Sequence, residues 1–352
     1  MADLHVHTDA TATVGLIGCG AIGSALDEGR PSSGNSLTHA AAIAGNPHLR
    51  LVGVADADAA RAATCARLRK AEQAFSSAED LLEAVRPDLL VLAVPPEGRV
   101  ELVERALARG IRAFFCEKPF AVDAAQAQRL QALLRESGAV CGVNYFRRWS
   151  PLARLLRQQL DRMGGAGGLQ RVGAVYGKGL ANNASHLLDL LATVIGYPTA
   201  GRLSPSPFTG FGPDASPDVL LEYEIDGRRI PCHMASTDYQ AYTLLEVDLI
   251  HAAGRIRVLD SGRVFEVSGV VPDADYPGYR HLAPEGRWDG CLRGAMDRAY
   301  EEWVRVLRGD GSPACTASDG QAVLQVLDSL RRIGAFPGLD ALVSSGRGAS
   351  WR

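Results

Sequence analysis

Val14-Gly15-Leu16-Ile17-Gly18-Cys19-Gly20-Ala21-Ile22-Gly23 is the stretch that decides the fold of this chain. An apolar run typical of a strand ends in Gly-x-Gly-x-x-Gly, and an alanine-rich sequence typical of a helix begins directly after it. In a strand–turn–helix setting these glycines permit a tight turn, the approach of a pyrophosphate and close helix–strand packing. The N–H groups at the helix N-terminus favour the phosphates. The stretch therefore predicts a dinucleotide-binding domain; a glycine-rich turn without a ligand is the alternative.

An acidic residue ends the next strand-like run, residues 49–56. A carboxylate at Asp56 can accept hydrogen bonds from both ribose hydroxyls of NAD, and it repels the 2′-phosphate of NADP. Asp56 lies farther from the glycines than the usual distance of about 20 residues. Residues 27–36, rich in Gly, Pro and Ser, account for the excess as an inserted loop. We therefore expect NAD as the cofactor and weaker binding of NADP.

The length and composition fit an enzyme of two domains. The chain has 352 residues, more than one hydrophobic core usually holds. Its net charge of −3 argues against binding to nucleic acid or to an anionic membrane. The sequence shows no membrane-spanning run and no signal peptide, and its seven cysteines lack metal-ligand spacing. We therefore expect a cytoplasmic protein with reduced thiols and neither a membrane nor a nucleic-acid partner.

The pair His5-x-His7 resembles the metal-binding pair of many metallohydrolases, because alternate residues of a strand point to the same face. The first predicted strand of the dinucleotide-binding domain begins only a few residues later, which leaves no room for a barrel unit. The remaining histidines show no second pair with this spacing. We therefore interpret residues 1–11 as a flexible tail and predict no metal site.

Residues 12–148 alternate between strand and helix patterns. We expect helices at residues 59–70, 97–109 and 123–137, and strands at residues 88–94, 111–116 and 139–144. Asp123 is the expected N-cap of the helix at 123–137. The alternation predicts an α/β Rossmann fold, a doubly wound parallel sheet that binds ligands at the carboxyl ends of its strands. Two strand-end sequences, Val94-Pro95-Pro96 and Glu117-Lys118-Pro119, are therefore expected at the cofactor edge.

Residues 149–335 have a different pattern, typical of an α+β domain with an open antiparallel sheet. The expected helices are residues 152–163, 185–195, 290–308 and 316–334. The expected strands are residues 219–225, 229–237, 243–251, 255–259 and 264–267. We interpret the proline-rich residues 198–217 as a surface loop and residues 336–352 as a C-terminal tail.

Several motifs occur in the order found in one known family. They are Gly18-x-Gly20-x-x-Gly23, Asp56, Val94-Pro95-Pro96, Cys116-Glu117-Lys118-Pro119, Asn144-Tyr145-Phe146-Arg147-Arg148-Trp149 and His186-x-x-Asp189. In these motifs the chain resembles the glucose–fructose oxidoreductase/inositol dehydrogenase (Gfo/Idh/MocA) family over roughly residues 12–335. The insert, the Arg-Arg-Trp segment and Asn182-Asn183-Ala184-Ser185-His186 are similar to a branch of sugar and cyclitol dehydrogenases of antibiotic or glycan biosynthesis.

The chemistry of such an oxidoreductase indicates which side chains matter. Moving a hydride between a carbinol and nicotinamide develops charge on the substrate oxygen, so the site needs a general acid–base and an electrostatic stabiliser. Lys118, at a strand end beside the cofactor edge, supplies a cation; an ion pair with Glu117 is the structural alternative. An imidazole ordinarily titrates near neutral pH, which suits His186 for proton transfer, and Asp189 lies one helical turn later.

These arguments and the resemblance define the expected site. The expected catalytic residues are Lys118, His186 and Asn182. The expected cofactor-binding residues are Gly18, Gly20, Ala21, Ile22, Gly23, Asp56, Val94, Pro95, Pro96, Glu117, Lys118, Asn144, Arg148 and Trp149. The expected substrate-binding residues are Lys118, Tyr145, Arg148, Asn182, Asn183, His186 and Asp189. For Trp149, packing at the domain interface is the alternative.

The chain departs from the family pattern at two positions. Many members carry an aspartate four residues before the histidine, where this chain has Asn182, and a histidine where this chain has Arg99. Asparagine can hydrogen-bond to substrate or imidazole, but it has no charge to stabilise an imidazolium. The resemblance therefore implies an NAD-dependent dehydrogenase or reductase of a sugar, amino sugar or cyclitol, acting as a homodimer or homotetramer. A catalytically silent NAD(P)-binding sensor and an oligomeric scaffold are the alternatives.

Overall fold

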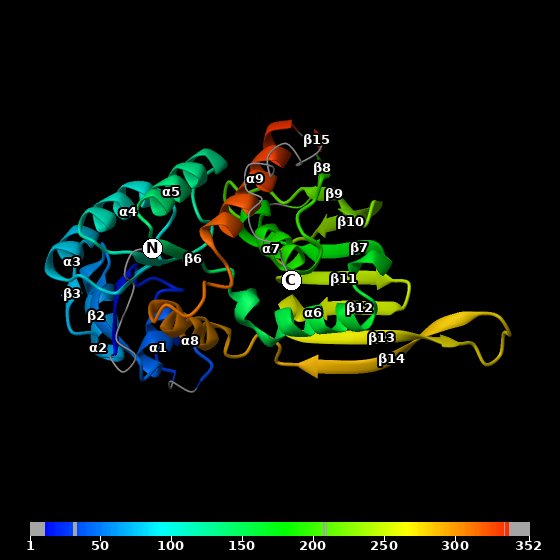
Figure 1. Cartoon of the computed structure of the whole chain (residues 1–352), viewed down its shortest axis with the longest axis horizontal. Coiled ribbons are helices and arrows are strands. Elements are labelled where there is room, and N and C mark those ends of the chain that lie inside the picture. The colour runs from blue at the N-terminus through cyan, green and yellow to red at the C-terminus, as the bar shows by residue number, and fades with distance from the viewer. Residues whose placement is uncertain (1–10, 31–33, 207, 209, 334, 338–352) are drawn as a thin grey trace. The chain divides into compact units, whose positions relative to one another are not determined.

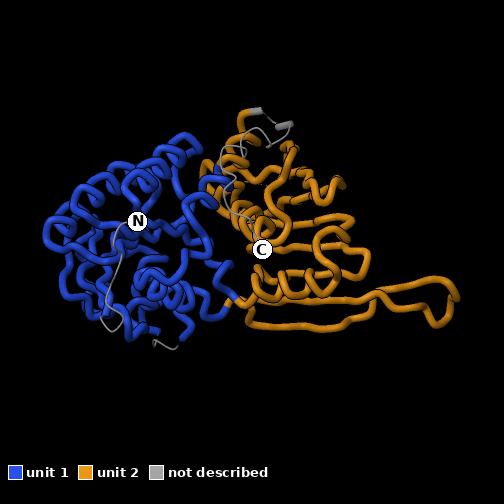
Figure 2. The backbone as a smooth tube through the Cα atoms, in the orientation of Figure 1, with its two compact units in different colours: residues 1–150, 293–324 blue, residues 151–292, 325–352 orange. Residues whose placement is uncertain are grey.

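A computed structural model describes residues 11–30, 34–206, 208, 210–333 and 335–337. Most of the two predicted tails, residues 1–11 and 336–352, lies outside these residues. Residues 336 and 337 are described and belong to a strand, Ala335–Pro337, which corrects the start of the predicted C-terminal tail. The chain divides into two compact units, residues Met1–Ser150 with Arg293–Leu324, and residues Pro151–Leu292 with Gln325–Arg352 (Figure 2). Residues 293–324, which the sequence analysis placed in the second domain, thus lie in the first unit. Among the described residues, no helix is long and apolar enough to cross a membrane.

The first unit is built on a six-stranded parallel sheet in the order β3-β2-β1-β4-β5-β6, which confirms the predicted doubly wound fold (Figure 1). Every residue of β4 and β5 is buried, as expected for strands covered on both faces. The strands are β1 (Ala12–Ile17), β2 (Leu49–Ala55), β3 (Ala74–Phe75), β4 (Leu89–Leu92), β5 (Ala113–Cys116) and β6 (Val140–Val143).

Helices cover this sheet, and side-chain caps fix where several of them begin. The side chain of Asp123 accepts a hydrogen bond from the backbone N–H of Gln126, as predicted for the N-cap of α5. Asp58 and Ser77 cap α2 and α3 in the same way. The helices are α1 (His39–Gly45), α2 (Ala59–Arg69), α3 (Ala78–Ala84), α4 (Arg99–Ala108), α5 (Ala124–Glu136), α8 (Ala295–Leu307) and the start of α9 (Ala317–Ile333), with the 3₁₀ turns η1 (Ala25–Asp27) and η2 (Phe146–Trp149).

The helix predicted directly after the glycine turn is interrupted, so that prediction is wrong. In the described part of residues 21–38, the helical structure is limited to a single turn around Gly23 and to η1, and α1 begins at His39. The backbone N–H groups of His39 and Ala40 donate to the carbonyls of Ile22 and Gly23. An uninterrupted helix makes such bonds over four residues, so roughly a dozen residues are inserted within its first turns. Without them, Asp56 stands at the usual distance from the glycines.

Asp27 closes the base of this insert. Its buried carboxylate accepts hydrogen bonds from the backbone N–H groups of Leu37 and Thr38, both at 2.8 Å, and from the Thr38 hydroxyl at 2.9 Å. Thr38 in turn caps α1, because its hydroxyl accepts from the N–H of Ala41. Three donors on one carboxylate allow the chain to leave the helix and to return to it at the same place.

The second unit holds a nine-stranded sheet in the order β14-β13-β12-β11-β7-β10-β9-β8-β15 (Figure 1). Its pairs are antiparallel except for β7 and β10, so the sheet is mixed. Strand β8 lies within the predicted loop at 198–217, which corrects that prediction, and β7 and β14 were not predicted. The strands are β7 (Leu169–Tyr176), β8 (Ala200–Ser204), β9 (Asp218–Ile225), β10 (Arg228–Ser236), β11 (Leu245–His251), β12 (Gly254–Leu259), β13 (Val264–Pro272), β14 (Arg280–Asp289) and β15 (Ala335–Pro337).

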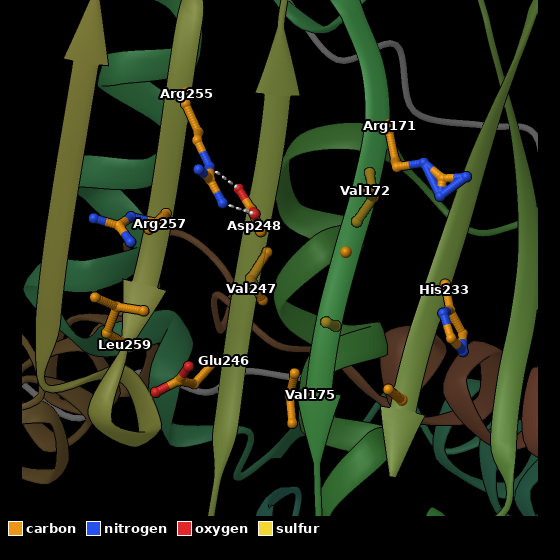
Figure 3. Close-up of a pocket in the computed structure, with 13 residues that line it drawn as sticks. Arg171, Val172, Val175, His233, Glu246, Val247, Asp248, Arg255, Arg257 and Leu259 are labelled. Atoms are coloured by element: carbon orange, nitrogen blue, oxygen red, sulfur yellow. Dashed lines mark hydrogen bonds and ion pairs between the residues drawn. The ribbon is translucent and has the colours of Figure 1, made fainter. Parts of the chain in front are cut away.

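Two helices, α6 (Pro151–Arg162) and α7 (Ser185–Ile195), pack on one another, and α6 also contacts β12 and β13. The opposite face of the sheet carries charged side chains from β7, β11 and β12 and the imidazole of His233 from β10 (Figure 3). On this face the Arg255 guanidinium binds both carboxylate oxygens of Asp248, at 2.8 and 2.5 Å. The β13–β14 hairpin extends well beyond its neighbours (Figure 2).

Candidate active site

The three glycines of the turn after β1 meet three different requirements. Gly18 has a φ of +98°, a conformation that side chains rarely adopt. A Cβ at Gly23 would overlap the carbonyl oxygen of Gly18, so only glycine permits this close packing. A Cβ at Gly20 would meet nothing within 4 Å. The open space therefore lies at the glycine that must leave room for a pyrophosphate.

Donors for phosphate oxygens are present at the same turn. No described residue accepts a hydrogen bond from the backbone N–H of Gly20, Ala21 or Ile22. Successive backbone N–H groups at the start of a helical turn form an anion-binding site. Because the donors and the space at Gly20 coincide, the turn fits the pyrophosphate of a dinucleotide.

Gly20→Ala is expected to weaken NAD binding about tenfold with little change in Tm, because the methyl group enters the space for the pyrophosphate and touches no protein atom. Gly23→Ala is the matched comparison, since its methyl group strikes the Gly18 carbonyl; it should cost about 1–3 kcal/mol of folding stability. Titration of NADH fluorescence and thermal unfolding measure the two effects. Wild-type NADH affinity in Gly20→Ala would contradict the placement of the pyrophosphate.

Asp56 lies directly after β2 and faces the glycine turn. Its Oδ2 accepts a hydrogen bond of 2.8 Å from the backbone N–H of Cys19, and its Oδ1 accepts one of 2.9 Å from that of Asp58. The guanidinium of Arg61 lies 3.3 Å from Oδ1. The side chain is 10% exposed. The carboxylate is thus held beside the pyrophosphate turn, where the family fingerprint places the ribose of the adenosine.

Arg99 joins the two strand-end turns at the cofactor edge. Its buried guanidinium donates to the carbonyls of Val94 at 2.7 Å, Glu117 at 2.8 Å and Phe120 at 2.9 Å, and also to that of Pro119. The turns after β4 and β5 therefore share one cation. An imidazole has at most two N–H donors, so the histidine usual in the family could not make this set of contacts.

The carboxylate of Glu117 is buried between three elements. Its Oε1 accepts from Nδ2 of Asn144 at 2.6 Å and lies 3.0 Å from Nε2 of His39. Its Oε2 accepts from the backbone N–H of Lys118 at 3.2 Å. Burial by itself would raise the pKa of Glu117, but the hydrogen bonds from His39 and Asn144 and the charge of Lys118 lower it below its ordinary value. Glu117 is therefore an anion at neutral pH.

Tyr300 of α8 completes this cluster. Its hydroxyl lies 2.7 Å from Nδ1 of His39, and the His39 side chain is fully buried. Burial, together with the charge of Glu117, raises the pKa of Tyr300, so the phenol keeps its proton. The sequence analysis did not single out His39 or Tyr300. The position of His39 one helical turn after the glycines, once the insert is removed, was the signal that could have indicated it.

The side chains of Arg148 and Trp149 contact other residues of the first unit. The Arg148 guanidinium lies 3.1 Å from Oδ1 of Asp319, and the Trp149 indole donates to Glu302 at 2.8 Å. Trp149 is 6% exposed and packs edge-on against Phe115. These contacts show that Trp149 packs within the first unit, and they do not test the predicted role of Trp149 at the cofactor or at the domain interface. Tyr145, like Asn144, is buried at the end of β6.

The candidate residues of the second unit surround the start of α7. A π-helical turn, Leu180–Ala184, precedes α7 and carries Asn182 and Asn183, while His186 and Asp189 lie buried in the first turns of α7. The side chain of Asn182 donates to the carbonyl of Lys178 at 3.2 Å. Inserted π turns in helices often mark functional sites.

Asp214 supports this π turn from the segment that was predicted to be a loop. Its carboxylate accepts from the backbone N–H groups of Ala181 at 3.0 Å and Asn182 at 2.8 Å. Arg331 lies 3.2 Å from the same carboxylate. A negative charge thus lies beside Asn182, although the residue itself is neutral. Sequence spacing gave no signal for Asp214, which is 32 residues from Asn182.

The structure thus brings the candidates together in two groups. Lys118, Glu117, Asn144 and Asp56 lie in the first unit with the glycine turn, and His186, Asn182, Asn183 and Asp189 lie in the second. A Rossmann sheet with this glycine turn and an acidic residue after β2 defines a dinucleotide-binding domain of the NAD type.

Comparison with a family model agrees with the motifs. Residues 12–145 match the model of the Gfo/Idh/MocA family, described as an oxidoreductase family with an NAD-binding Rossmann fold. The dinucleotide-binding domain is thus similar to that of this family, as the motifs predicted.

Curated relatives support the assignment. An inositol 2-dehydrogenase of Rhizobium meliloti is 32% identical over 155 residues, which are 43% of this chain and 41% of the relative. The match thus spans about two fifths of that enzyme. The rhizopine catabolism protein MocA of Rhizobium meliloti is 24% identical over 336 residues, which are 90% of this chain and 93% of the relative.

Solved structures share the fold over almost the whole chain. The WlbA dehydrogenase of Bordetella pertussis in complex with NADH and UDP-GlcNAcA superimposes with a TM-score of 0.74 at 19% identity, covering 94% of this chain and 99% of that one. A levoglucosan dehydrogenase in complex with NADH and L-sorbose gives a TM-score of 0.71 at 17% identity, covering 92% and 97%. At these identities the likeness concerns the fold alone.

Proposed function

We propose that this protein is an NAD-dependent dehydrogenase or reductase that moves a hydride between nicotinamide and a secondary hydroxyl or ketone of a sugar, amino sugar or cyclitol. The observation that carries the proposal is the position of Lys118. Its backbone is held by the ionised Glu117 at the carboxyl end of β5, at the edge of the sheet where a Rossmann domain binds its cofactor. The names of the relatives support the substrate class.

In this proposal NAD, when bound, supplies the hydride acceptor or donor. The ammonium group of Lys118 stabilises negative charge on the substrate oxygen as it develops. His186 accepts the hydroxyl proton during oxidation and returns it during reduction. Asn182 and Asn183 orient the substrate by hydrogen bonds, and Asp56 holds the adenosine ribose.

A catalytically silent sensor is the second candidate, favoured by the neutral Asn182 where many family members have a carboxylate. Titration of NADH fluorescence followed by turnover assays on a panel of sugars and cyclitols separates the two. NAD binding with turnover supports the enzyme. NAD binding without turnover of any polyol supports the sensor, and absence of NAD binding contradicts both.

The pathway and the assembly are also proposals. A keto sugar is a substrate for transamination, which suits a role in the biosynthesis of aminoglycosides or related compounds.

We further propose a cytoplasmic homodimer or homotetramer formed through the charged open face of the second unit's sheet (Figure 3). Acidic and basic side chains alternate on this face, so a second copy can pair with it. Sedimentation of the wild type and of Arg255→Glu measures the assembly.

Asn182→Asp is expected to move the rising limb of the pH profile for oxidation to higher pH, by about one unit. An added carboxylate favours the imidazolium form of His186, whereas the base must be neutral to accept a proton. The measurement is kcat/KM against pH. Asn183→Asp is the matched control, which adds the same charge one residue away and should shift the limb less. A limb that persists in His186→Asn would show that another group titrates.

A further inference from the structure

A buried chain of polar groups lies behind the Glu117–Lys118 turn. It runs from the hydroxyl of Tyr300 through the imidazole of His39 to the carboxylate of Glu117, and then to the backbone N–H of Lys118. The three side-chain members come from α8, α1 and the end of β5. Tyr300 and His39 are 261 residues apart in the sequence.

The direction of the hydrogen bonds follows from the charges. An ionised carboxylate can only accept, so Nε2 of His39 carries a proton and donates to Glu117. The hydroxyl of Tyr300, which keeps its proton, pairs with the other ring nitrogen of His39, Nδ1, at 2.7 Å. Each member thereby fixes the orientation of the next. In the low-dielectric interior of a protein, hydrogen bonds connected in series polarise and strengthen one another.

We propose that His39 and Tyr300 are positioning residues for the proposed reaction: they hold the Glu117 carboxylate against the backbone N–H of Lys118 and so fix where the Lys118 side chain begins. Neither residue needs to contact substrate or cofactor for this role. The inference rests on the proposed function of Lys118. It extends the site to α8, an element from the far end of the chain.

The surroundings of Glu117 leave few other groups that could perform this task. Asn144 also donates to Oε1 and fixes one lone pair. The Arg99 guanidinium faces the backbone carbonyl of Glu117, and Lys118 and Cys116 are its charged or titratable neighbours along the chain. Asn144 also reaches α8, but only through a contact of 3.9 Å with the sulfur of Met296. Among the described residues, the His39–Tyr300 pair therefore links the carboxylate to α8 by two short hydrogen bonds.

Loss of His39 or Tyr300 is expected to raise the pKa of Glu117. A buried carboxylate with fewer donors has a higher pKa, so it takes up a proton at a pH where the wild type does not. The protonated form no longer attracts Lys118. As the pH is lowered, the activity of the variants should therefore begin to fall at a higher pH than the activity of the wild type.

The test compares Tyr300→Phe and His39→Gln with the wild type. We expect the acid limb of kcat to move upward by about half a unit to one unit and kcat at pH 6 to fall by about three- to tenfold, with the Kd of NADH within about threefold. Tyr223→Phe, which removes the hydroxyl of another buried tyrosine, is the matched control and should leave the limb in place. Variants that lose activity only in proportion to Tm, with an unmoved limb, would overturn the inference.

A second readout needs no substrate. Infrared difference spectra across a pH titration follow the carboxyl band that disappears in Glu117→Gln, and this band should appear at higher pH in Tyr300→Phe and His39→Gln. An unmoved band overturns the inference whatever the activity. A wild type that turns over no polyol while the band still moves overturns the proposed function and leaves the electrostatic link between Tyr300 and Glu117 standing.

Discussion

Lys118→Ala is expected to lower kcat about a hundredfold or more while changing the Kd of NAD only a few-fold. A cation that stabilises developing charge acts mainly in the transition state, so its loss affects turnover more than ground-state binding. The glycine turn and Asp56 do not depend on the Lys118 side chain, because their contacts are made by other residues. Steady-state turnover and NADH titration measure the two quantities.

The control for this variant is Lys70→Asn. Lys70 is exposed and ends α2 with a φ of 57°, a conformation that asparagine tolerates, so turnover should remain near the wild-type value. Lys118→Arg keeps the charge but displaces it, and it should recover only part of the activity. Near-native turnover in Lys118→Ala would show that the lysine serves the structure through Glu117 alone.

Most of the first unit could be predicted from local sequence. The strands of the Rossmann sheet are continuous apolar runs between turn residues, and the N-cap Asp123 is a local signal that the structure bears out. The glycine pattern likewise specifies a backbone geometry over a few residues. Interactions between residues close in the sequence determine these features, so they can be predicted from short stretches of sequence.

The split helix and the cluster behind Glu117 could not be predicted in this way. Carboxylate contacts of Asp27 decide where the helix stops and resumes, and they join residues that lie ten and eleven positions apart. His39 and Tyr300 meet only because α8 returns to the first unit. Tertiary contacts across more than two hundred residues leave no periodic signal in the sequence.

The second unit shows a related difference. Strand β14 is mostly exposed, so it lacks the alternation of apolar and polar residues that marks a half-buried strand. Strand β8 lies among prolines, at the border of the sheet next to β15. Asp214 follows it and fixes the π turn before α7 by contacts that spacing does not reveal. The candidate residues on α7 could be predicted, but the contacts of Asp214 that hold the turn before α7 could not.

Cofactor choice is the other property with a large expected effect: NAD should bind about a hundredfold better than NADP. Hydrogen bonds from ribose hydroxyls to a charged group contribute about 1.5–3 kcal/mol each, and a 2′-phosphate both removes one such contact and meets the negative charge of Asp56. The carboxylate is fixed toward the turn by the N–H groups of Cys19 and Asp58. It therefore cannot turn away from a phosphate without losing two donors.

The variants Asp56→Ala and Arg61→Ala separate the contributions of these two side chains to the preference for NAD. Asp56→Ala should weaken NAD binding and strengthen NADP binding, because the repulsion is gone and Arg61 loses one of its two carboxylate partners. Its Nη2, now 3.3 Å from Asp56, can then meet the 2′-phosphate while its Nε stays paired with Asp58. Arg61→Ala is the matched variant, in which NAD binding should change little and the remaining affinity for NADP should fall. Fluorescence titrations of the wild type and the two variants with NADH and NADPH give the six dissociation constants. Equal constants for the two cofactors in the wild type would show that Asp56 does not read the ribose.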